Sequence, residues 1–126
     1  MAPLTERDLT ALRNSRKFTI RVFTPAMLFG MGLFHLVVCI IGLRLSARLA
    51  DLGGYTFEEV FQQWIAGITL SESYTGSMVK ALERLSLSVM HFGMVFFFSI
   101  LGYATVIQNR RNRRILGFVE RNKNRA

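Results

Sequence analysis

The chain has 126 residues, of which 51% are hydrophobic, and its formal net charge is +8. Composition alone does not exclude a soluble domain, since such domains are about 45–50% apolar. The arrangement of the charges argues against a soluble domain, because no Asp, Glu, Lys or Arg occurs from residue 22 to 43 or from residue 85 to 107. Each stretch exceeds the roughly 20 residues that a helix needs to cross a bilayer. The sequence therefore predicts an all-α membrane protein with two transmembrane helices.

Two predicted elements come first, a basic segment and a transmembrane helix. Thr5 and Asp8 in the basic segment have the spacing of a helix N-cap. Pro25 suits the first turn of the transmembrane helix, where a missing N–H costs little, and the Gly53-Gly54 pair favours its end. The apolar run is too long for a cleaved signal peptide, so we interpret it as a permanent membrane span.

The clearest local motif lies in the connection between the two spans. Thr56 and Glu59 match a capping box, which predicts a helix over 56–67. Apolar side chains recur there at helical spacing, with Glu and Gln on the other side, so the helix is predicted to be amphipathic. Its face lacks Lys and Arg, which lipid-surface helices usually carry. Contact with lipid and contact with a partner protein therefore both remain open for Phe57, Phe61 and Trp64.

The second span is expected to continue as a long helix beyond the bilayer, because only tolerated glycines interrupt it. A transmembrane hairpin results, with the following predicted segments: a basic cytoplasmic N-terminal segment, 1–21; the first transmembrane helix, 22–50; an extracytoplasmic loop with the amphipathic helix, 51–77; the second transmembrane helix with its cytoplasmic extension, 78–114; and a basic cytoplasmic tail, 115–126.

Basic residues concentrate near both ends of the chain. Residues 1–21 hold five basic and two acidic side chains, residues 108–126 hold seven and one, and residues 44–84 hold four and five. The positive-inside rule assigns basic segments to the cytoplasm, which predicts that both termini are cytoplasmic. Basic side chains beside a span also attract anionic lipid headgroups, and we prefer this role to nucleic-acid binding. The predicted anchors are Arg44, Arg48, Arg110, Arg111, Arg113 and Arg114.

A search for catalytic groups finds no recognisable nucleophile, metal motif or phosphate-binding loop, so we expect a protein that is not an enzyme. Neither span holds a carboxylate, and the single Cys39 can form no internal disulfide. The two histidines, His35 and His91, both lie within spans, at depths that differ by about one helical turn. Ionisable side chains inside a membrane are candidates for function.

Two interpretations of the histidines remain open. In the one we favour, they share polar contacts across packed helices, with small residues that let the helices approach. In the other they are axial ligands of haem b or of a chlorophyll-type pigment. No resident metal or other cofactor is predicted beyond that alternative. The small residues assigned to helix interfaces are Gly32, Gly42, Gly93 and Gly102.

These patterns predict a small subunit that scaffolds or anchors other membrane-protein subunits, because two helices alone bury little surface. Secretion or conjugation machines, respiratory complexes and photosynthetic complexes all use such subunits, and the sequence does not choose among them. The expected location is a bacterial inner membrane or an equivalent energy-transducing membrane. A cofactor-binding electron-transfer or pigment subunit is the first alternative, and a self-assembling, holin-like or pore-forming protein is the second.

Overall fold

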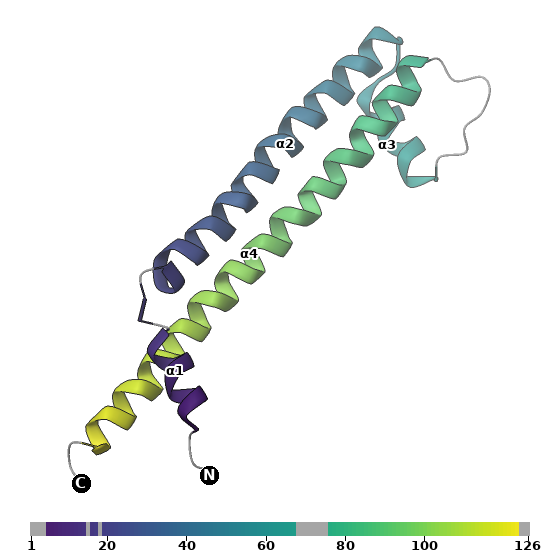
Figure 1. Cartoon of the computed structure of the whole chain (residues 1–126). Coiled ribbons are helices and arrows are strands. Elements are labelled where there is room, and N and C mark those ends of the chain that lie inside the picture. The colour runs from purple at the N-terminus through teal and green to yellow at the C-terminus, as the bar shows by residue number, and fades with distance from the viewer. Residues whose placement is uncertain (1–4, 15, 18, 68–75, 124–126) are drawn as a thin grey trace. The chain divides into compact units, whose positions relative to one another are not determined.

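A computed structural model of the chain describes residues 5–14, 16–17, 19–67 and 76–123. Every regular element in these ranges is helical, which confirms the predicted all-α class (Figure 1). The elements in chain order are α1, Glu6–Asn14; a short π-helix, η1, Thr19–Phe23; α2, Thr24–Leu52; α3, Phe57–Ile65; and α4, Gly76–Lys123. Residues 68–75 of the predicted extracytoplasmic loop, 51–77, lie outside the described residues.

Two of these helices are long and apolar enough to cross a membrane. One helical stretch extends from Thr19 to Leu52 and the other from Gly76 to Lys123, and each contains an apolar window. In their most apolar windows only 11% and 17% of the residues, respectively, are buried within the structure. A core helix of a soluble protein buries its apolar face against other elements. These two helices instead leave large apolar side chains exposed along their length.

The chain divides into two compact units, each described here by itself. The central unit comprises residues 32–96, and the terminal unit comprises residues 1–31 and 97–126. Helices α2 and α4 contribute segments to both units. In the central unit, Ser46 on α2 lies beside Ala81 on α4, and His35 lies beside His91. These pairings show that the two segments run antiparallel there.

The core of the central unit lies where α2, α3 and α4 meet. Buried residues from all three helices form this core, and four partly buried residues pack against it. Small residues let the helices approach, and the larger ones fill the space between them. The buried members are Ala50, Val60, Met78, Ala81, Leu82 and Leu85.

Local signals fix both ends of the turn between α2 and α3. Gly54 has a φ of 78°, and its N–H donates to the Asp51 carbonyl over 3.0 Å. The Tyr55 N–H donates to the Ala50 carbonyl, also over 3.0 Å. This is the bonding pattern of a Schellman C-cap, in which a left-handed residue is best supplied by glycine. The chain therefore leaves α2 at the glycine pair, as the sequence predicts.

Helix α3 begins at the expected capping box. The Thr56 hydroxyl accepts from the Glu59 N–H at 3.2 Å, and the Glu59 carboxylate accepts from the Thr56 N–H at 2.7 Å. The helix ends at Ile65 with Ala66 as its C-cap, slightly inside the predicted range of 56–67. Val60 is fully buried, and the Trp64 indole N–H donates to the Ser86 hydroxyl at 3.0 Å. These two residues hold α3 against the central unit.

In the terminal unit, a proline and an asparagine together define how the first span begins. A π-turn pairs a carbonyl with the N–H five residues later, and for Ile20 that residue is Pro25, which has no N–H. The Asn109 side-chain amide, on α4, donates to the Ile20 carbonyl at 2.8 Å and is itself buried. The Asn109 amide thus supplies to the Ile20 carbonyl the hydrogen-bond donor that Pro25 cannot supply.

Helix α4 is longer than the predicted 78–114, because it continues to Lys123 through most of the predicted tail. Leu116, within that continuation, is only 2% exposed, so the apolar residues of the tail take part in packing. Arg16 also forms an ion pair with Glu120, at 2.7 Å. Packing and helical continuity therefore extend α4 into the basic segment that follows residue 114.

Candidate functional site

The two histidines of the spans lie in direct contact in the central unit. Their Nδ1 atoms are 2.7 Å apart, which is hydrogen-bond distance, and their ring centroids are 5.0 Å apart at an interplanar angle of 30°. One Nδ1 must donate the hydrogen bond and the other must accept it. Two neutral histidines in this pair therefore hold different tautomers. Both rings are half-buried. The contact joins α2 to α4 through a polar bond.

The rings as placed leave no gap for a macrocycle between the histidines, because they stack on each other with their Nδ1 atoms 2.7 Å apart. The cavity beside His91 has a volume of about 120 Å³, below the roughly 300 Å³ of the smallest usual ligand pockets.

A wider metal cluster is also missing from the part of the chain that the structure describes. No three His, Cys, Asp or Glu side chains come together there. Cys39 is buried as a free thiol and lines an apolar groove rather than a polar site. The structure shows the polar contact between His35 and His91, and the choice between a packing role and a cofactor stays a prediction.

The four glycines assigned to helix interfaces have different surroundings. A Cβ on Gly42 would collide with the Ser88 side chain, and one on Gly102 would lie 3.0 Å from the Phe29 ring. Gly32 is buried. Gly93 is exposed, and a Cβ there would meet nothing within 4 Å. Gly42 and Gly102 thus allow close helix approach within the chain, whereas Gly93 has no such role inside it.

Sequence reasoning missed a polar contact beside Gly42. The Ser46 hydroxyl, fully buried, donates across the interface to the Ala81 carbonyl at 2.8 Å. The signal was present, because Gly42, Ser46 and Ala50 follow one another at intervals of four residues. Small residues at this spacing form the close-packing face of a transmembrane helix.

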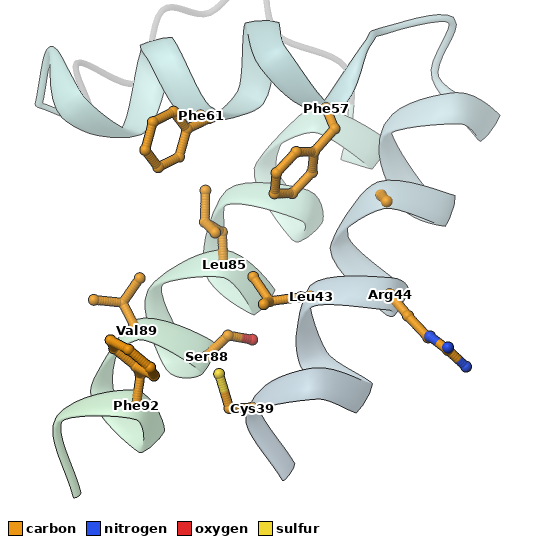
Figure 2. A pocket seen from close by; sticks show the side chains of 10 residues that line it. Cys39, Leu43, Arg44, Phe57, Phe61, Leu85, Ser88, Val89 and Phe92 are labelled. Carbon is orange, nitrogen blue, oxygen red and sulfur yellow. The ribbon is translucent and has the colours of Figure 1, made fainter. Parts of the chain in front are cut away.

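The aromatic residues of α3 fall into two groups. Trp64 is partly buried and hydrogen-bonded to Ser86, as described above. Phe57 and Phe61 remain 37% and 42% exposed. Their rings point from α3 into a groove that α2 and α4 also line (Figure 2). The structure thus leaves part of the predicted interface of α3 uncovered.

The predicted arginine anchors are mostly exposed. Five of the six have exposed side chains, and the partly buried Arg113 donates through Nε to the Asn109 carbonyl at 3.3 Å. The only ion pair within the described ranges is the one between Arg16 and Glu120. All six anchors therefore lack an acidic partner in the described part of the chain, which leaves their charge available to an external anion.

Comparisons of the chain with protein-family models, with curated proteins and with solved structures return no match.

Proposed function

We propose that this chain is a non-enzymatic integral-membrane subunit that anchors or scaffolds a larger multi-subunit complex. In this proposal α2 and α4 cross the bilayer as a hairpin, with α3 in the extracytoplasmic connection and both termini in the cytoplasm. The membrane is a bacterial inner membrane or an equivalent energy-transducing membrane.

One observation carries the proposal: the long helices expose large apolar side chains, while their buried polar side chains are hydrogen-bonded within the chain. Large exposed residues occur on both, among them Leu33, Phe34, Phe96 and Ile100. Among the described residues, no buried side-chain nitrogen or oxygen lacks a hydrogen-bond partner. Hydrocarbon offers no hydrogen bonds, so a membrane protein must satisfy its polar groups internally. In water, the apolar side chains would instead be buried and the polar groups exposed.

The exposed surface also supports a partner. Exposed apolar patches larger than a few hundred Å² are uncommon on soluble monomers and mark contacts with lipid or protein. Gly93 is a small residue on such a surface, and a Cβ added to it would meet no described side chain within 4 Å. Small residues let a second transmembrane helix approach closely. We therefore assign Gly93 to the contact with another subunit.

Two experiments test the location and the topology. Alkaline carbonate should leave the full chain in the membrane pellet, and its release would contradict a membrane-spanning protein. In a Cys39→Ser background, an impermeant maleimide should label Glu58→Cys from outside intact cells and Arg121→Cys only after lysis. Labelling of Arg121→Cys in intact cells would contradict the proposed orientation.

Co-purification from the native membrane tests the role as a subunit. The chain should be recovered with other membrane proteins in fixed proportion after mild detergent extraction. Gly93→Leu should remove them without changing the helical circular dichroism. Gly93→Ala is the matched control, since alanine at this open position is still a small residue that lets a second helix approach. A chain recovered only as itself, or equal recovery with both variants, would contradict the proposal for Gly93.

A further inference from the structure

An apolar groove lies in the central unit beneath α3. Phe57 and Phe61 form one wall, and Leu43 of α2 and Val89 of α4 lie on the opposite side (Figure 2). Ala47 also lines the groove. Its volume is about 480 Å³, and its surface is apolar throughout. On α2 it extends from Cys39 to Ala47, which is about 12 Å along the helix.

We propose that this groove binds one acyl chain of an anionic phospholipid whose phosphate pairs with Arg44. The proposal rests on the membrane location argued above and adds a specific lipid site to it. A groove with apolar walls that opens into hydrocarbon is filled most favourably by hydrocarbon, because apolar contacts form with no polar group left unpaired.

The occupant must lie between α3 on one side and α2 and α4 on the other, along about 12 Å of α2. A single unbranched acyl chain is thin enough to lie between the α3 phenylalanines and the side formed by α2 and α4.

Charge complementarity favours an anionic headgroup. Arg44 is the only charged residue that lines the groove. Figure 2 shows its guanidinium pointing away from the groove, so a phosphate would be held outside while the chain lies inside. The Arg44 side chain is exposed and forms no ion pair within the described ranges. Guanidinium groups bind phosphate through two parallel hydrogen bonds.

The single tryptophan provides a reporter for this site. Trp64 lies next to Phe61 on α3, with ring centroids 6.3 Å apart, and no other tryptophan contributes to the fluorescence. The full chain is reconstituted in phosphatidylcholine nanodiscs that contain increasing fractions of phosphatidylglycerol with brominated chains. Saturable quenching of Trp64 is expected. Brominated phosphatidylcholine should need about fivefold more lipid for the same quenching, since one basic residue near a membrane contributes about a fivefold preference for anionic lipid.

Two variants with matched controls separate the chain from the headgroup. Ala47→Phe fills the groove and should abolish saturable quenching, while Ile40→Phe, on the exposed surface of α2, should retain it. Arg44→Gln should remove the preference for phosphatidylglycerol, and Lys80→Gln should keep it, because Lys80 is exposed, does not line the groove and is not among the predicted anchors. If Ala47→Phe does not fold, Val89→Phe blocks the same groove from α4.

Equal quenching in Ala47→Phe and Ile40→Phe would overturn the site, because it would mark lipid at the general surface. Equal preferences in Arg44→Gln and Lys80→Gln would overturn the headgroup assignment. A chain that resists carbonate but shows no saturable quenching would refute the groove while the proposed membrane location stands. Extraction by carbonate would refute the location instead.

Discussion

The central unit and the terminal unit are stabilised by different kinds of contact. The central unit has a core of six buried apolar residues that join three helices, together with buried serine and histidine contacts. In the terminal unit the described buried residues are fewer, and its long-range bonds include the Asn109–Ile20 contact and the exposed Arg16–Glu120 pair. Close packing should therefore dominate the stability of the central unit, and a few polar bonds should dominate that of the terminal unit.

The largest expected effect comes from the core of the central unit. Leu82 is 1% exposed, so Leu82→Ala should lower the free energy of unfolding by about 2–5 kcal/mol. Thermal unfolding in detergent, followed by circular dichroism, measures the change. Leu87→Ala is the control, since Leu87 is 40% exposed. Similar losses for both variants would show that this core does not dominate the unit.

Close approach at Gly42 should give the next effect. A methyl group there collides with Ser88, and overpacking of this kind costs about 1–3 kcal/mol. Gly42→Ala should therefore lower the melting temperature, and adding Ser88→Ala should restore part of the loss. Gly93→Ala serves as the control, because a Cβ at Gly93 has open space. A stable Gly42→Ala would disprove the tight contact.

In the terminal unit, the Asn109 bond should matter because Pro25 cannot replace it. Loss of the amide in Asn109→Ala leaves the Ile20 carbonyl unpaired, at a cost of about 1–3 kcal/mol. The change is measured by unfolding in detergent. Pro25→Ala restores an N–H near that carbonyl, so the double variant should lose less than Asn109→Ala alone. Strictly additive losses would argue that the two residues act independently.

The histidine contact should contribute less than either packing feature. Hydrogen bonds across membrane helices average about 0.6 kcal/mol in double-mutant cycles. His35→Leu, His91→Leu and the double variant should therefore show a coupling energy near this value in detergent unfolding. The purified protein should also lack a Soret or chlorin absorption band. Such a band, lost in the double variant, would contradict the packing role.

The smallest effect concerns the start of α1. The hydrogen bonds from the Thr5 hydroxyl and then the Thr5 N–H lower the pKa of Asp8 below its ordinary value. Because the folded form has the lower pKa, the stabilisation of α1 is present above the ordinary value and is lost as the pH falls through the lowered one. NMR titration of the Asp8 carboxyl should show this. Thr5→Ala should raise the pKa, and an unchanged titration would refute the cap.

The sequence by itself determined the elements whose causes are local. The charge-free runs specify two long apolar helices, since their length and composition suffice. The Thr56–Glu59 capping box and the Gly53-Gly54 stop depend on neighbours within a few residues, and both occur where the sequence places them. The depths of His35 and His91 could also be compared from helical rise alone, which correctly suggested that they approach each other.

Only the tertiary structure decided which residues of the long helices meet. Gly42 and Gly93 are alike in sequence, yet one packs against Ser88 and the other has open space, because helix rotation sets the buried face. The direct Nδ1 contact of the histidines depends on the same rotation. The continuation of α4 beyond residue 114 follows from packing of Leu116. These outcomes require the register and rotation of separate helices, which no short stretch of sequence encodes.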